Sequence, residues 1–121
     1  MWKNFNIHIK YELNKREELT MVKIKLFCAS GMSTSVLVSK MREAAKAKGV
    51  DCQIDAYSES KIDEHLNDMD VALLGPQVAY TLPKIKEKCD PVGVPVEVIP
   101  MVDYGMMNGA KVLDLALSLA K

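Results

Sequence analysis

The sequence has 121 residues, of which 49% are hydrophobic and 26% are charged, and its formal net charge is zero; this is the composition of one globular domain. It holds no block of basic residues, so binding along a nucleic-acid backbone is not expected. No apolar stretch approaches the roughly 20 residues that span a bilayer, and the first residues lack the apolar region of a secretory signal, so we expect a cytoplasmic protein without membrane insertion.

The first 20 residues differ from the rest of the chain. They are polar and charged, and they show neither a helical nor a strand period. The run Lys15-Arg16-Glu17-Glu18 is readily encoded by a purine-rich stretch like a ribosome-binding site, just upstream of Met21. We therefore expect residues 1–20 to be a non-native or disordered extension and residues 21–121 to form the domain. The alternative is a short, poorly ordered tail.

From Val22 onward, short apolar runs alternate with longer amphipathic segments, which is typical of βαβ units around a parallel sheet. Strands are predicted over 22–27, 52–57, 71–74 and 94–99. Four helices are predicted: one that Ser33 or Thr34 caps and Gly49 ends, a short one capped by Ser58 or Ser60, one over 77–88 with Pro83 in its first turn or at a bend, and one capped by Asn108. Pro95 places the fourth strand at an edge of the sheet.

Right-handed crossovers between these strands predict an α/β fold, a three-layer sandwich with a four-stranded parallel sheet in the order 2-1-3-4 flanked by helices. The loops after the first, third and fourth strands then converge at one edge. They read CASGMSTS, GPQ and PMVDYGMMNG. Ligands of open α/β sheets bind at this edge, where the strand order reverses, so we expect the functional site there.

Cys28 directly follows the first predicted strand and precedes small and hydroxylated residues. A loop between a strand and a helix exposes backbone N–H groups, and the helix N-terminus adds positive potential, so the segment suits phosphate. The same groups favour a thiolate and a phosphoryl group in transit. Cys28 is therefore the candidate nucleophile for phosphoryl transfer. The candidate phosphate-binding residues are Ala29, Ser30, Gly31, Met32, Ser33, Thr34 and Ser35.

Other interpretations of this loop stay open. A cysteine at the end of a strand can be a small buried hydrophobe. A small cysteine phosphatase uses a Cys-x5-Arg loop, but Thr34 occupies the arginine position and Arg42 lies two turns into the predicted helix. Hydrolysis of a cysteinyl phosphate should then be slow, which favours a carrier. An FMN-binding module would leave Cys28 without a role, and few aromatic residues are available to stack on a flavin.

The segments LFCASGMSTSVLVSKMREAA, DVALLGPQVAY and PVEVIPMVDYGMMNG together resemble the lactose/cellobiose (chitobiose) family of enzyme IIB components of the bacterial phosphotransferase system (PTS). The resemblance implies that Cys28 accepts a phosphoryl group from a phosphohistidine of enzyme IIA. It further implies transfer to a sugar, such as cellobiose or chitobiose, held by the membrane permease enzyme IIC. The surface facing these partners would include Met32, Gly75, Pro76, Gln77 and Tyr80, and the segment 103–109 would border the same edge.

The pattern of cysteines and histidines indicates neither a cofactor nor a metal site. Cys28, Cys52 and Cys89 form no CxxC pair, and only His8 and His65 could complete a set of metal ligands, so zinc and a disulfide framework are not expected. We expect Cys52 and Cys89 to be structural, and His65 to have a solvated or capping role on an acidic helix. A monomer is expected, and the sequence does not fix the sugar.

Overall fold

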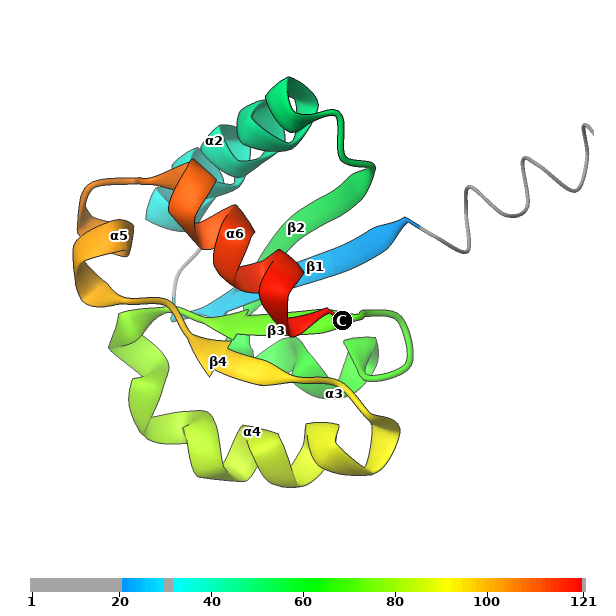
Figure 1. The fold of residues 1–121 in the computed structure, drawn as a ribbon. Helices are drawn as coiled ribbons and strands as arrows, with labels where there is room; N and C mark the ends of the chain where they lie inside the picture. The colour runs from blue at the N-terminus through cyan, green and yellow to red at the C-terminus, as the bar shows by residue number, and fades with distance from the viewer. Residues whose placement is uncertain (1–20, 30–31, 121) are drawn as a thin grey trace, which may run out of the picture.

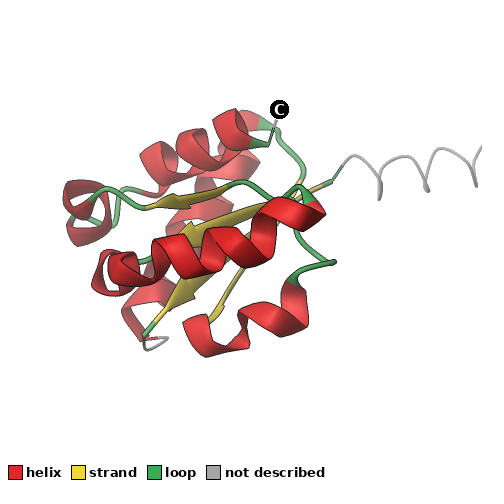
Figure 2. Cartoon of the chain, turned by 90° about the horizontal axis from the view of Figure 1, so that it is seen from below, coloured by secondary structure: helices red, strands yellow, loops and turns green. Residues whose placement is uncertain are grey.

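The structure is a computed structural model that describes residues 21–29 and 32–120, apart from the side chains of Met32 and Ser33. The prediction for residues 1–20 lies outside the described residues. One parallel sheet contains β1 (Val22–Cys28), β2 (Cys52–Ser58), β3 (Val71–Leu74) and β4 (Val96–Val98) in the order β2-β1-β3-β4. Figure 2 shows these strands pointing the same way between helices. The predicted fold class and strand order are confirmed.

Strand β3 is central and strand β4 is at an edge, as their sequences predict. All four residues of β3 are buried, because helices cover both faces of the sheet. Strand β4 is shorter than the predicted range 94–99, since Pro95 has no N–H to donate to the ladder. The pairing nevertheless continues past both ends of β4: Ala72 N donates to Pro95 O at 3.0 Å, and Ile99 N donates to Leu74 O at 2.8 Å.

Helices α2 (Met32–Lys48) and α6 (Gly109–Leu119) cover one face of the sheet, and α3 (Ile62–His65) and α4 (Leu82–Cys89) cover the other (Figure 1). The alternation of β1 side chains explains the two cores. Ile24, Leu26 and Cys28 pack in the core with α2 and α6, whereas Phe27 packs in the core with α3 and α4. None of the helices in the described ranges is both long and apolar enough to cross a bilayer.

Several helix boundaries differ from the prediction. Helix α2 begins at Met32, so Ser33 and Thr34 lie in its first turn rather than at its cap. Ser58 makes no capping hydrogen bond, because its hydroxyl lies 3.1 Å from that of Ser60. The predicted helix over 77–88 consists of a 3₁₀ segment, η2 (Pro76–Thr81), and then α4, with Pro83 in the first turn of α4.

Other boundaries agree with the prediction. Gly49 follows the last residue of α2 with a φ of +69°, a left-handed conformation that suits glycine at a helix end. Asn108 caps α6, its Oδ1 accepting from Lys111 N at 3.2 Å. The sequence did not reveal three short elements: η1 (Glu59–Lys61), η3 (Asp90–Val92) and α5 (Met101–Gly105). Each has five residues or fewer, too few to show a helical period.

Candidate functional site

Cys28 is the last residue of β1, opposite Ser58 of β2. The carboxyl ends of the strands lie together on the left of Figure 1, beside the start of α2 and beside α5. Because Cys28 belongs to the strand, the pleat fixes the direction of its side chain, which packs on the α2 and α6 side of the sheet. The side chain is buried, with 1% of its surface exposed. A reaction at this thiol therefore requires that the sulfur become accessible.

Gly75, directly after β3, packs against the thiol of Cys28. Its N–H donates to Phe27 O at 3.0 Å, which extends the pairing of β3 with β1. A Cβ atom at Gly75 would lie 2.7 Å from Cys28 Sγ and 2.7 Å from Gln77 Oε1. Only glycine leaves room for both side chains here. The structure thus brings Cys28, Gly75 and the Gln77 carboxamide together; that Gly75 and Gln77 face the partners stays a prediction.

The predicted phosphate-binding segment is described in part. Ser30 and Gly31 lie outside the described residues, as do the side chains of Met32 and Ser33, whose backbone forms the start of α2. Ala29 and Ser35 are exposed. Thr34 is fully buried, and its Oγ1 lies 3.3 Å from the Tyr104 hydroxyl. Its hydroxyl therefore contacts the core, which leaves its backbone N–H as the group it can offer to a phosphate.

Large apolar side chains are exposed on the elements at this edge. These exposed side chains are Val36, Tyr80, Met101, Val102 and Met106, hereafter the apolar edge surface. They belong to the first turns of α2, to η2, to α5 and to the residue after α5. Tyr80 was predicted to face partners. Met101 and Val102 were missed, although two apolar residues after Pro100, where the strand ends, are a signal that could have shown them.

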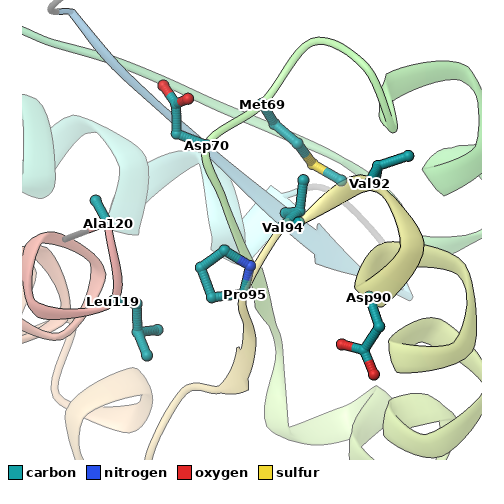
Figure 3. A pocket seen from close by; sticks show the side chains of 9 residues that line it. Met69, Asp70, Asp90, Val92, Val94, Pro95, Leu119 and Ala120 are labelled. Carbon is teal, nitrogen blue, oxygen red and sulfur yellow. The ribbon is translucent and has the colours of Figure 1, made fainter.

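The groups that would support a phosphatase lie elsewhere. Arg42 donates to Ile54 O from Nη2 at 2.6 Å and pairs with Asp55 at 3.0 Å, so its guanidinium is held on β2. Asp90 precedes β4 and lines a pocket of about 540 Å³ together with Pro95 (Figure 3). That pocket is at the amino ends of β3 and β4, opposite the edge that holds Cys28. Arg42 therefore does not clamp a phosphoryl group at the thiol, and Asp90 is not placed to act as a general acid there.

His65 is part of a polar cluster on the face of the sheet away from Cys28. Lys25 Nζ, nearly buried in β1, donates to His65 Nδ1 at 2.9 Å and binds Asp68 at 3.2 Å. The His65 ring stacks on Tyr57, with 3.9 Å between ring centroids. Burial, and then the positive charge of Lys25, lower the pKa of His65. His65 is half-buried in the last turn of α3, and the sequence did not reveal that Lys25 and Tyr57 hold its imidazole against the sheet.

The other two cysteines lack the surroundings of a reactive thiol. Burial, and then the nearby Asp90, raise the pKa of Cys89. Burial and Asp51 raise the pKa of Cys52. All three cysteines are unpaired. Within the described ranges, no three His, Cys, Asp or Glu side chains are grouped so that they could hold a metal ion.

The comparisons with known proteins agree with this arrangement. Residues 23–115 match the family of lactose/cellobiose-specific IIB subunits of the PTS. The galactose-specific EIIB component of Lactococcus lactis subsp. cremoris is 50% identical over 101 residues, which are 79% of this chain and 94% of that protein. The cellobiose-specific EIIB component of Lactococcus lactis subsp. lactis has the same identity and coverage.

A solved structure shares the fold as well as the sequence. The cellobiose-specific phosphotransferase IIB component of Borrelia burgdorferi has a TM-score of 0.69 and 40% identity, over 82% of this chain and 91% of that one. The family match, the sequence identity and the shared fold all indicate the same family. The chain belongs to the lactose/cellobiose-specific IIB family of the phosphotransferase system, and it is a phosphotransferase component of that system.

Proposed function

We propose that Cys28 carries the phosphoryl group. Its thiolate attacks the phosphorus of a phosphohistidine on enzyme IIA, so that the S–P bond forms as the N–P bond breaks. A hydroxyl of the sugar held by the permease enzyme IIC then attacks the same phosphorus: the O–P bond forms, the hydroxyl loses its proton and the Cys28 sulfur leaves. The observation that carries the proposal is the position of Cys28 between the end of β1 and the start of α2.

The electrostatics of this position favour an anion. Helix α2 has 17 residues and no acidic residue in its first turn. The first N–H groups of a helix have no partner within it, and the dipole stabilises a nearby anion by about 0.3 to 1 kcal/mol. Several such N–H groups acting together stabilise a thiolate and a phosphoryl group more than the dipole alone. A phosphoryl group on Cys28 would therefore be held without a metal ion or a side-chain cation.

The apolar edge surface supports docking of the two partners at this edge. Exposed apolar side chains that gather on one part of a monomer mark interaction sites. A carrier must release each partner after transfer, so we expect small, transient contacts with enzyme IIA and enzyme IIC. A monomer suffices, because Cys28, Gly75 and Gln77 all come from one chain. Unpaired cysteines agree with a role in the reducing cytoplasm.

We propose a disaccharide such as cellobiose or chitobiose as the sugar. One of the two relatives with 50% identity carries the name galactose-specific and the other cellobiose-specific. Overall identity of the IIB chain therefore does not separate these sugars. We assign the choice of sugar mainly to the permease, which holds it during transfer.

Incubation with labelled phosphoenolpyruvate, the general PTS proteins and enzyme IIA tests the carrier function. We expect label on Cys28, no label in Cys28→Ser, and full labelling of the matched control Cys52→Ser. Stable label on His65, or label that persists in Cys28→Ser, would overturn the proposal. The phosphatase alternative predicts turnover of an aryl phosphate without partners, and we expect none because Arg42 is bound to β2.

A further inference from the structure

The side-chain oxygen of Gln77 lies against Gly75, although Gln77 is an exposed residue of η2. The position that a Gly75 Cβ would occupy is 2.7 Å from Gln77 Oε1 and 2.7 Å from Cys28 Sγ. Both atoms therefore lie against the Cα of Gly75, which brings the carboxamide within reach of a group attached to the sulfur. A group bonded to Sγ and extending over Gly75 would meet the carboxamide.

A phosphoryl group on Sγ would place strong acceptor oxygens near this carboxamide. A carboxamide carries two N–H donors on one side and an acceptor oxygen on the other, and a half-turn about its last bond exchanges them. With the NH₂ group turned toward the sulfur, Gln77 can donate to a phosphoryl oxygen. With the oxygen turned toward the sulfur, the carboxamide offers no donor to a phosphoryl group.

We propose that Gln77 is a phosphoryl-binding residue: its side-chain NH₂ donates to an oxygen of the phosphoryl group on Cys28. The proposal rests on the carrier function of Cys28 and assigns to Gln77 a role other than contact with a partner. The hydrogen bond exists only in the phosphorylated state. It therefore shifts the phosphoryl equilibrium between enzyme IIA and this protein toward this protein, in addition to the backbone N–H groups near the start of α2.

The equilibrium constant distinguishes this role from docking. In this reaction, phosphorylated IIA passes its phosphoryl group to free IIB. The equilibrium constant depends only on the free energies of the separated proteins with and without the phosphoryl group. A residue that merely contacts enzyme IIA changes the rate of approach to equilibrium and leaves the constant unchanged. A residue that binds the phosphoryl group changes the constant itself. Hydrogen bonds to charged groups are strong enough for a change of about tenfold.

The variants Gln77→Met, which keeps side-chain length without the amide, and Gln77→Glu, which adds a negative charge, test the proposal. The matched control is Gln53→Glu, because Gln53 is an exposed residue of β2 whose Nε2 lies 3.5 Å from Asp55 Oδ2. Labelled phosphoryl groups are followed to equilibrium at low protein concentration, and the thiol pKa is read from thiolate absorbance. We expect the constant to fall about tenfold in Gln77→Met and further in Gln77→Glu, with Gln53→Glu like wild type.

The outcomes separate the two proposals. If Cys28 is labelled but the constant is the same in Gln77→Met as in wild type, the phosphoryl-binding role is wrong and the carrier function stands. A slower rate with an unchanged constant makes Gln77 a docking residue, which also overturns the role. A third contrary result is a fall in the equilibrium constant that a change in the Cys28 thiol pKa fully explains. If Cys28 takes up no label in wild type, the carrier function itself fails.

Discussion

Thr34 and Tyr104, which are 70 residues apart in the sequence, meet in the core with their hydroxyl oxygens 3.3 Å apart. Thr34 belongs to the first turn of α2, and Tyr104 belongs to α5, which follows β4. Both side chains are buried, so water does not compete for the contact. The pair therefore holds α5 against the end of α2 that would bind phosphate, and it places the apolar side chains of α5 at that edge.

Replacement of Tyr104 by phenylalanine removes this contact while keeping the ring. We expect the free energy of unfolding to fall by about 1 kcal/mol, the net value of one buried hydrogen bond, as measured by urea denaturation. The control is Tyr80→Phe, because Tyr80 is 79% exposed, and it should leave stability unchanged. Equal stabilities of the two variants would show that the Thr34 contact adds nothing.

The sequence predicted what local pattern and chain handedness determine. Alternating apolar runs and amphipathic segments gave four strands and the order β2-β1-β3-β4, because parallel crossovers are right-handed. Asn108 as a helix cap and Gly49 as a helix end could also be predicted, because each role depends only on residues a few positions away in the chain. Cys28 could be selected because a strand, small residues and a helix start follow one another along the chain.

Contacts between distant segments could not be predicted in this way. Thr34 is predicted as a helix cap and a phosphate-binding residue, yet its hydroxyl contacts Tyr104, because α5 folds over the start of α2. No pattern in the sequence indicates the place of Lys25, which is buried because α3 places His65 above it. The predicted strand order placed Gly75 at the same edge as Cys28, but it did not show that Gly75 packs against the thiol. Its requirement for glycine comes from strand pairing that no local pattern reveals.

Substitution of Gly75 by alanine should impair phosphoryl acceptance more than it impairs folding. The new Cβ would lie 2.7 Å from Cys28 Sγ and from Gln77 Oε1, so both side chains must move. We expect stability to fall by about 1 to 3 kcal/mol, as in other overpacked sites, and labelling of Cys28 to slow at least about tenfold, since ~1.4 kcal/mol is tenfold in rate.

The matched control for this substitution is Gly105→Ala in α5, at the same edge of the sheet. A Cβ there has no neighbouring atom within 4 Å, so both stability and labelling should match wild type. Labelling at the wild-type rate in a folded Gly75→Ala protein would mean that the space over Gly75 takes no part in transfer.

The pKa of His65 makes stability depend on pH in a defined window. Burial and the charge of Lys25 lower this pKa below its usual value of about 6.5. The unfolded chain then binds a proton more tightly than the folded protein, so stability falls as pH drops from about 6.5 to the folded pKa. Above that window the imidazole is neutral in both states and contributes no slope. His65→Gln should flatten the dependence there.

Lys25→Met tests the cause of this shift. The charged and titratable groups near the imidazole are Lys25, Asp55, Tyr57, Glu64 and Asp68. Since Lys25 is the cation among them, its removal should raise the pKa of His65, measured by NMR titration of the ring. A pKa that stays the same or falls would show that burial alone sets it.

The reactivity of Cys28 should reveal how a buried thiol takes part in transfer. Cys28 and Cys89 are both buried, with 1% and 0% exposed. Cys28 lies at an edge of the sheet, whereas Cys89 is packed in the core between α4 and the sheet. We expect a local opening to expose Cys28 and a much larger unfolding event to expose Cys89. Alkylation read residue by residue by mass spectrometry should modify Cys28 first.

Urea below the unfolding transition distinguishes the two kinds of opening, because its effect grows with the surface exposed in the reactive state. Alkylation of Cys89 should accelerate steeply with urea, and alkylation of Cys28 should change little. Tyr104→Phe should speed the reaction at Cys28 if α5 helps to cover this edge. Equal urea slopes for the two cysteines would mean that Cys28 reacts only from the unfolded chain, and a thiol reached only in that way could not serve as a carrier.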